Sequence, residues 1–381
     1  MNTNLKRSII TAGTFLFIFS ICCQGQSLIF KPGEIWPDTE GNHINAHGGG
    51  ILLYNGVYYW FGESRLARSE KDRTHYGVGC YSSKDLVTWK NEGLVLQVVN
   101  DTASLMVKGC VIERPKVIYN KKTNKFVMWF HHELKGQGYK AALTGVAVSN
   151  SVTGPYRYIR SIRPNAGVWP VNFTEEQKNA TIKESDLKSW SDEWKKAVKE
   201  GLFLRRDFTG GQMSRDMSLF VDSDGKAYHI HSSEENQTLH FSELTDDYLD
   251  FTGRYVRVLP GDANEAPAIF KSKGNYYLIT SGTTGWKPNP ARLAVSKGLL
   301  GEWTSLGNPC RGTDEQNKIT FGSQSTDILQ VQGKKDLFIF MADRWVPQDL
   351  TDSRYIWLPV EWENGNPVIR WYPEWDISKL K

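Results

Sequence analysis

The sequence predicts an all-β protein, a five-bladed β-propeller with a helical insertion between blades 2 and 3. The first observation behind this prediction is composition: 12% of the 381 residues are aromatic and 34 are glycine, which suits many short strands joined by tight turns. The second is self-similarity. One unit, made of a polar residue, an apolar strand, a turn and an aromatic strand, occurs five times along the chain, and repetition of short multi-stranded units is typical of propellers.

Residues 1–26 are predicted to be a signal peptide. Two basic residues, Lys6 and Arg7, precede the apolar stretch Ile9–Cys22, which is too short and too early to span a membrane. Cys22 and Cys23 end this stretch, so secretion after cleavage and acylation of one of the two cysteines both remain open. In either case we expect an exported protein that is periplasmic, secreted or held as an outer-surface lipoprotein.

The mature chain, residues 27–381, is expected to be a monomer with one catalytic propeller domain and no transmembrane helix. The formal net charge of the sequence is +4, without a concentrated block of Lys and Arg, which argues against a nucleic-acid partner. Cys80, Cys110 and Cys310 are too few and too scattered for a disulfide framework or a zinc site. One disulfide and three buried thiols both remain open.

The first two repeat units each predict a β-hairpin at the start of a blade. The first unit opens with residues 45–50, Asn-Ala-His-Gly-Gly-Gly, and turns at Asn55-Gly56; an Asn-Gly pair between apolar runs is the strongest short hairpin signal. The second unit opens at Glu113-Arg114-Pro115 and turns at Thr123-Asn124. A further strand and a loop follow each hairpin and would complete the sheet.

The longest interval between units contains the one segment with helical character, from about Thr174 to Gly201. Residues 174–177, Thr-Glu-Glu-Gln, resemble a helix start, and apolar residues recur at spacings of three and four; these are Leu187, Trp190, Trp194, Ala197 and Val198. The insertion could form one wall of a substrate cleft. A solvated excursion is the favoured interpretation, because long insertions in loops cost little free energy.

The third, fourth and fifth units open at Asp216, Glu265 and Gln324. Glu265 precedes Ala-Pro, where the residue ahead of the proline is expected to be extended, so the glutamate would stand on a rigid strand start among apolar neighbours. Such surroundings raise the pKa of a carboxyl group and make it a proton donor. A surface glutamate at a turn is the alternative. Glu234 and Glu235 end a strand and could mimic the acid.

The polar residues that open the five units are expected to meet in one central funnel, because the innermost strands of a propeller converge on its axis. Three carboxylates and an amide in one pocket are costly as structure but suit acid–base chemistry. Glycoside hydrolysis needs a carboxylic acid to protonate the leaving oxygen and a second group to handle water. The gathered residues are Asn45 or His47, Glu113, Asp216, Glu265 and Gln324.

Two segments resemble glycoside hydrolase family 43: the one that contains Asp216, "DMSLFVDSDGKAY", and the one that begins at Glu265, "EAPAIFKSKGNYYLITSG". The resemblance covers essentially the whole mature chain. It implies a five-bladed propeller and an inverting hydrolysis in which Glu265 is the general acid. Asp216 would tune the pKa of that acid and help to orient it.

The first unit departs from most of this family, which carries a general-base aspartate there. The segments "NAHGGGILLYNGVYYWFGE", "ERPKVIYN", "SGTTGW" and "FGSQST" are similar to the branch of exo-β-1,3-galactanases. That likeness implies that Gln324 holds the water, as an imidic tautomer, and that Glu113 contacts the substrate. We therefore expect release of galactose from β-1,3-galactan or arabinogalactan-type glycans. An α-L-arabinofuranosidase or β-xylosidase of the same fold and a non-catalytic glycan-binding propeller are the alternatives.

Further residues are candidates for substrate binding. Trp286 and Trp345 could form sugar-stacking walls, with core packing as the competing interpretation. Arginines Arg114, Arg215 and Arg344 could pair with the central carboxylates. Asn45 and His47 are included, although His47 is better explained as fixing the glycine-rich turn. No cofactor or catalytic metal is expected, and a structural calcium ion in the central channel remains open.

Overall fold

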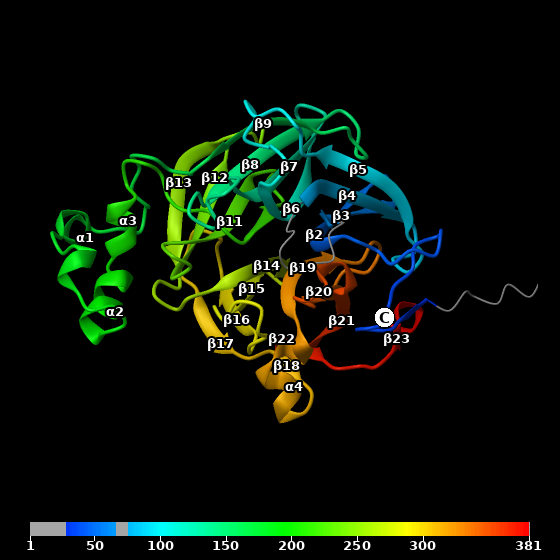
Figure 1. Cartoon of the computed structure of the whole chain (residues 1–381). Coiled ribbons are helices and arrows are strands. Elements are labelled where there is room, and N and C mark those ends of the chain that lie inside the picture. Colours follow the sequence, from blue (N-terminus) through cyan, green and yellow to red (C-terminus); the bar gives the residue numbers. More distant parts are fainter. Residues whose placement is uncertain (1–27, 66–74, 381) are drawn as a thin grey trace, which may run out of the picture.

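The computed structural model describes residues 28–65 and 75–380 (Figure 1). Within this part of the chain, five antiparallel sheets surround a central axis, which confirms the predicted five-bladed β-propeller. The predicted signal peptide, with Cys22 and Cys23, lies outside the described residues. None of the helices in the described ranges is long and apolar enough to cross a membrane.

Each blade follows the chain outward from the axis, and the innermost strand comes first. Blade 1 contains β2 (His47–Tyr54), β3 (Val57–Arg65), β4 (His75–Ser83) and β5 (Lys90–Gln97). Blade 2 contains β6 (Val111–Asn120), β7 (Lys125–Glu133), β8 (Leu143–Ser149) and β9 (Arg157–Ile162). Blade 3 contains β10 (Met217–Val221), β11 (Ala227–Ser233), β12 (Thr238–Leu244) and β13 (Phe251–Val258).

The last two blades have the same order, and blade 5 has one additional strand. Blade 4 contains β14 (Glu265–Ser272), β15 (Asn275–Ser281), β16 (Arg292–Ser296) and β17 (Thr304–Gly307). Blade 5 contains β19 (Gln324–Gln330), β20 (Phe338–Arg344), β21 (Arg354–Glu363), β22 (Asn366–Arg370) and the short β18 (Cys310–Arg311), which adds in parallel to β22. The innermost strands contact one another in a closed ring, in the order β2, β6, β10, β14 and β19.

The two ends of the described chain close the propeller together. Strand β1 (Ile29–Phe30) pairs with β23 (Trp375–Asp376). The ring of Phe30 stacks on that of Trp375 with centroids 4.2 Å apart, and the Trp375 indole donates a hydrogen bond to the carbonyl of Trp357 in β21, at 2.8 Å. The N-terminal strand β1 is thereby held against blade 5, which is built from residues near the C-terminus.

Aromatic side chains fill the contact between blades 1 and 5. Trp60 of β3 and Trp357 of β21 are almost completely buried with ring centroids 4.7 Å apart, and buried Trp89 lies 5.4 Å from Trp60. The high aromatic content thus serves the core, as large rings contribute much buried apolar area. Cys80, Cys110 and Cys310 are separate buried thiols, and burial raises the pKa of Cys110 to about 11 and that of Cys310 to about 12.

The insertion between blades 2 and 3 is helical, as predicted, but it consists of short helices outside the ring. These are α1 (Glu175–Asn179), a 3-10 turn (Glu184–Asp186), α2 (Asp192–Lys199) and α3 (Leu202–Arg206). A capping box of Thr174 and Gln177 begins α1. Trp190 does not join the predicted apolar face, because it lies between helices and is 64% exposed. In Figure 1 the helices lie on the outer side of β13, far from the inner strands.

Four of the innermost strands carry a β-bulge near their start, and in β19 the pairing register shifts between Ser325 and Asp327. The pairing register shifts by one residue after His47 in β2, after Glu113 in β6 and after Glu265 in β14. The residue that follows each of these has a positive φ: Gly48 at 59°, Arg114 at 55° and Ala266 at 53°. Bulges change the direction of side chains at the ends of sheets. The same backbone feature therefore sets the direction of the residues that open blades 1, 2 and 4.

The conformation of Ala266 corrects one expectation from the sequence. The residue before Pro267 was expected to be extended, whereas Ala266 lies in the left-handed region with φ of 53°. This conformation costs about 1–2 kcal/mol for a residue other than glycine. It is held here because the Ala266 amide donates a hydrogen bond to Asp216 Oδ2, at 3.0 Å, across the boundary between blades 3 and 4.

Candidate active site

A cavity of about 270 Å³ opens at the end of the axis where the innermost strands begin. Seven residues that the sequence singled out lie together in its wall: Glu113, Arg114, Asp216, Glu265, Trp286, Gln324 and Trp345. Arg215, predicted to pair with a carboxylate, lines it as well. The remaining lining residues are Glu63, Arg65, His131, Tyr139, Asn236 and Gly285. No residue of the helical insertion lines the cavity, so among the described residues the insertion forms no wall of it.

Glu265 and Asp216 form a carboxyl pair in this cavity. The Asn236 amide donates a hydrogen bond to Glu265 Oε1, at 2.7 Å. Asp216 accepts the amide of Ala266, the next residue after Glu265. Burial and the negative charge of Asp216 raise the pKa of Glu265 to about 7, against the opposing charges of Arg114 and Arg215. Glu265 can therefore carry a proton near neutral pH.

Arg114, at the start of blade 2, contacts residues of blades 1, 3 and 5. Its guanidinium donates a hydrogen bond to Gln324 Oε1, at 2.6 Å, and pairs with Asp216 Oδ2 at 3.1 Å. The same group donates to the carbonyl of Ser325, at 2.8 Å, and the Arg114 backbone amide donates to Glu63 Oε1, at 3.1 Å. The bulge in β6 makes this geometry possible, because it turns the backbone at Arg114 into the left-handed region.

The side-chain amide of Gln324 has a defined orientation. Its Oε1 accepts hydrogen bonds from Arg114 and from the Trp345 indole, the latter at 3.3 Å. Its Nε2 donates to the hydroxyl of Ser281, at 3.0 Å. Because guanidinium and indole groups can only donate, the atom that they contact must be the oxygen. The amide nitrogen consequently faces away from the two pocket residues and toward β15.

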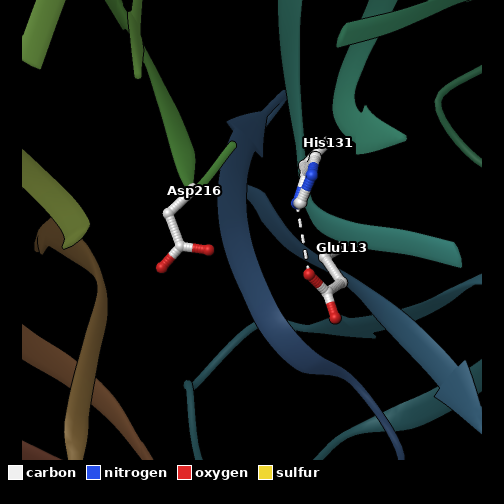
Figure 2. Close-up of side chains that lie close together, drawn as sticks. All are labelled: Glu113, His131 and Asp216. Atoms are coloured by element: carbon white, nitrogen blue, oxygen red, sulfur yellow. Dashed lines mark ion pairs between the residues drawn. The ribbon is translucent and has the colours of Figure 1, made fainter. Parts of the chain in front are cut away.

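Glu113 is held as a carboxylate beside a histidine. Figure 2 shows the ion pair between Glu113 and His131 Nδ1, at 3.1 Å; Tyr139 donates a hydrogen bond to Glu113, at 2.6 Å. Burial opposes ionisation, yet His131 and Arg65 hold the pKa of Glu113 well below its usual range. Burial would also lower the pKa of His131, but the carboxylates of Glu113 and Glu133 raise it to about 9.

Glu113, His131 and Asp216 each offer one ligand atom within 4.8 Å of the others, the spacing of a metal site (Figure 2). The donor set does not fit a cation. Both ring nitrogens of His131 face carboxylates, Glu113 on one side and Glu133 on the other, at 3.1 and 3.0 Å, so the ring is an imidazolium without a free lone pair. Asp216 is already paired with Arg114. The cluster is therefore better explained as an ion-pair network.

The central channel, where a structural calcium ion was left open, contains the ammonium group of Lys116. A cavity of about 780 Å³ at the far end of the channel is lined by all five innermost strands and reaches Lys116 and Asp327. Lys116 Nζ donates a hydrogen bond to the carbonyl of Gly48, at 2.8 Å. Burial lowers the pKa of Lys116 to about 8, partly offset by Asp327. The chain thus supplies a cation of its own near the axis.

Three predicted binding residues lie outside the cavity. Asn45 bonds to the backbone of Arg65, through its side-chain oxygen at 3.2 Å and through its amide group. His47 is fully buried and stacks on Tyr355, with ring centroids 5.3 Å apart. Arg344 donates to the carbonyl of Phe321, at 2.7 Å. These three side chains support the structure behind the wall of the cavity.

Several site residues were missed because they end the second strand of a blade. In an antiparallel pair, the end of the second strand lies opposite the start of the first. The register places Glu63 opposite His47, His131 opposite Glu113, and Asp343 opposite Gln324. The signal was present in the sequence, since polar residues end each aromatic run. Asn236 and Tyr139 lie in loops and offered no such signal.

Comparisons with known proteins agree with the five-bladed propeller fold. A family model described as glycosyl hydrolases family 43 matches residues 169–367. A solved GH43 β-1,3-galactosidase, in complex with galactodeoxynojirimycin, is 54% identical, with a TM-score of 0.88 over 91% of this chain and 100% of that one. Comparison with curated protein sequences finds no match.

Two exo-β-1,3-galactanases are more distant solved relatives. The enzyme from Clostridium thermocellum is 36% identical, with a TM-score of 0.73 over 91% of this chain and 66% of that one. The enzyme from Phanerochaete chrysosporium, solved with β-1,3-galactotriose, is 32% identical, with a TM-score of 0.72 over 92% of this chain and 68% of that one.

Proposed function

This chain belongs to glycosyl hydrolase family 43, and on that premise we propose that it is an exo-acting, inverting glycosidase that releases galactose from β-1,3-galactan or the galactan part of arabinogalactan-type glycans. The similar solved structures include a β-1,3-galactosidase and two exo-β-1,3-galactanases. The observation that carries the proposal is the carboxyl pair of Glu265 and Asp216 in a cavity of about 270 Å³.

In this proposal Glu265 is the general acid. Its carboxyl group donates a proton to the glycosidic oxygen as the bond to the anomeric carbon breaks. The pKa of about 7 supports this role, since it keeps a proton on the group under neutral conditions. Asp216 raises that pKa by its charge, and its bond to the Ala266 amide holds the start of β14 in place.

Gln324 is proposed to hold the water that attacks the anomeric carbon. No aspartate opens blade 1, where β2 begins His47-Gly48-Gly49-Gly50. The Gln324 amide lies in the cavity wall with its oxygen toward Arg114 and Trp345. Glu113, kept anionic by His131, is proposed to accept hydrogen bonds from sugar hydroxyls.

The shape of the cavity supports attack at a chain end. A volume of about 270 Å³ is below the roughly 300–1,000 Å³ typical of pockets for drug-sized ligands. Trp286, which is 37% exposed, packs edge-on against Trp345 with ring centroids 5.5 Å apart. The exposed indole of Trp286 is proposed as the surface on which the sugar stacks.

Product analysis of the purified mature protein tests the proposal. β-1,3-Galactan, arabinan and xylan are supplied separately, and the released sugars are identified, with the first-formed anomer followed by NMR. We expect galactose, released one unit at a time and first as the α-anomer, from the galactan alone. Arabinose or xylose instead would replace the galactanase with an arabinofuranosidase or xylosidase of the same fold, and a first-formed β-anomer would contradict inversion.

We also propose that the protein is exported, on the strength of the predicted signal over residues 1–26. Mass spectrometry of the protein recovered from its native host would show either cleavage near Gln24–Gln26 or an acylated N-terminal cysteine at Cys22 or Cys23. A full-length, unmodified chain in the cell interior would contradict the export proposal.

A further inference from the structure

Gln324 lines two cavities in the structure. Its oxygen lies on the side of the sugar cavity, among Arg114 and Trp345, whereas its nitrogen donates to Ser281 Oγ, at 3.0 Å. A neutral amide is a very weak base, so it cannot keep the proton that an attacking water loses. If Gln324 takes part in the proposed hydrolysis, a stronger acceptor has to lie behind it.

The second, smaller cavity is lined by Gln324 and by Ser281, the partner of the amide nitrogen. It has a volume of about 20 Å³, and its wall includes Ser281, Gln324, Asp343 and Trp345. A cavity of about 10–15 Å³ is sufficient for one water molecule when polar partners surround it. Ser281 and Asp343, both of which line the cavity, carry side chains that can serve as such partners. One water would therefore connect the two side chains.

Asp343 is placed to act on Gln324 through this cavity. The two residues are directly opposite each other in the antiparallel pair β19–β20, so their side chains lie on the same face of the sheet. Asp343 is 2% exposed, and its Oδ2 accepts the backbone amide of Gly48, at 2.5 Å. The groups that face it are Arg114 and Lys116 of β6, Glu63 of β3 and Tyr355 of β21.

The electrostatic surroundings give Asp343 a pKa suited to this task. Burial raises the pKa of Asp343 to about 7, with Glu63 adding to the rise and the Gly48 amide, Arg114 and Lys116 opposing it. A carboxylate with this pKa accepts a proton near neutral pH and releases it again afterwards.

We propose that Asp343 is the final acceptor of the proton lost by the attacking water, reached through Gln324 and Ser281. The inference rests on the proposed function. As the water oxygen bonds to the anomeric carbon, Glu265 gives its proton to the leaving oxygen. The attacking water takes the place of the Trp345 indole, the longer of the two hydrogen bonds to Gln324 Oε1, and passes its proton to that oxygen. The Nε2 proton passes to Ser281 Oγ, and the Ser281 hydroxyl proton passes through the cavity water to Asp343.

The protons balance over one turnover. Glu265 loses one proton and Asp343 gains one, while Gln324 becomes its imidic tautomer and Ser281 stays neutral. After the product leaves, the same relay runs in reverse: Asp343 returns its proton through Ser281 to Nε2, and the proton on Oε1 goes to solvent. Glu265 takes up a proton from solvent. Asp343 acts through Gln324 and does not touch the sugar.

The variant Asp343→Asn tests this role, because an asparagine oxygen can still accept the Gly48 amide. We expect kcat/KM for β-1,3-galactobiose to fall by about 10²–10⁴-fold, the usual contribution of a proton-transfer group. The loss should lie in kcat, and the Kd of galactodeoxynojirimycin should stay within about threefold. The acidic limb of the wild-type pH profile, near pH 7, should disappear, because it reports protonation of Asp343.

A substrate with a good leaving group separates Asp343 from Glu265. 2,4-Dinitrophenyl β-galactoside needs little help from an acid, so we expect it to restore much of the activity of Glu265→Gln. It should not restore Asp343→Asn, whose defect concerns the water. The matched control is Asp222→Asn, a carboxylate on the opposite end of the channel that accepts the backbone amide of Ser223; it should keep the wild-type rate and pH profile.

Ser281→Ala keeps the proposal testable if Asp343→Asn does not fold. It removes the hydroxyl between Gln324 and the small cavity, and we expect kcat to fall at least tenfold with inhibitor binding retained. Wild-type kcat and pH profile in Asp343→Asn would overturn the inference, and so would a loss explained by weaker inhibitor binding. If the wild-type protein released no galactose, the proposed function itself would fail, which is a separate outcome.

Discussion

At the scale of single residues, two glutamates in one cavity have opposite protonation. Burial and the charge of Asp216 raise the pKa of Glu265, whereas His131 and Arg65 lower that of Glu113 in spite of its burial. Both residues directly precede a strand bulge and both line the same cavity. Burial favours the protonated form of both groups, and the different charges and hydrogen bonds around them separate a proton donor from a permanent anion, a division of roles that acid–base sites commonly use.

Glu265→Gln should remove turnover of galactan and change how stability depends on pH. The pKa of the Glu265 carboxyl group is about 7 in the folded state and roughly 4.3 in the unfolded state. Between about pH 4 and pH 7 the folded state therefore binds more protons than the unfolded state. As a result, the free energy of unfolding of the wild type falls as the pH rises through this range. Glutamine does not titrate, so the free energy of unfolding of the variant does not fall for this reason. Relative to wild type, we expect it to gain up to about 3 kcal/mol between pH 4 and pH 8.

Urea denaturation at both pH values measures this difference. Glu175→Gln, at an exposed carboxylate on α1, is the matched control and should follow the wild-type curve. Equal stability of Glu265→Gln and wild type at pH 4 and pH 8 would show that Glu265 is not protonated in the folded state. Full activity of the variant would remove it from the role of general acid.

At the scale of elements, the glycine run at the start of β2 is required by close packing. A Cβ atom on Gly48 would lie within 3.0 Å of Glu63 Oε1, and Gly48 has a φ of 59°. A Cβ atom on Gly50 would collide with Lys116 and Asp327 in the channel. The glycines of the blade-1 motif therefore reflect the space left by their neighbours.

Gly48→Ala should destabilise the protein far more than an alanine at a hairpin tip. Gly56 also has a positive φ, of 75°, but nothing lies within 4 Å of an added Cβ atom. We expect Gly56→Ala to cost about 1–2 kcal/mol, the penalty of the left-handed conformation alone. Gly48→Ala should cost about 1–3 kcal/mol more, because it adds overpacking.

Chemical denaturation of both variants gives the two values. An equal loss of stability in Gly48→Ala and Gly56→Ala would mean that the Glu63 side chain moves aside without strain. The measurement would then contradict the close-packing explanation of the motif. It would leave the assignment of the bulges untouched, since that depends on the pairing register.

At the scale of the whole molecule, the propeller is closed by its two ends. Blade 5 is built from late residues, and β1 is fastened to it through β23. The stack of Phe30 on Trp375 and the bond from Trp375 to the Trp357 carbonyl hold this closure. A ring of blades that separates at one contact exposes the apolar faces on both sides, so this contact contributes to the stability of the whole domain.

Trp375→Ala should lower the free energy of unfolding by about 3–5 kcal/mol, as is usual for a buried tryptophan, and reduce the Tm measured by calorimetry. Trp190→Ala is the matched control. That indole is 64% exposed, so its removal should change stability by no more than about 0.5 kcal/mol. Similar effects of the two substitutions would show that the closure contributes little.

Much of this architecture could be predicted from local patterns. The five hairpins, the position of the insertion and the residues that open each innermost strand follow from hydrophobic alternation and turn residues, which act over a few neighbours. The common cavity of Glu113, Asp216, Glu265 and Gln324 follows from them, because the innermost strands of a propeller must meet at its axis.

The sequence by itself therefore determined the blades and the residues that open them. Only the tertiary structure decided which polar side chains face the cavity. The same bulge follows His47, Glu113 and Glu265, yet the two glutamates line the cavity, whereas His47 is buried behind it. Tertiary structure also decided the proton affinities. The pKa of a buried group depends on charges that folding brings from other blades, as Asp216 does for Glu265.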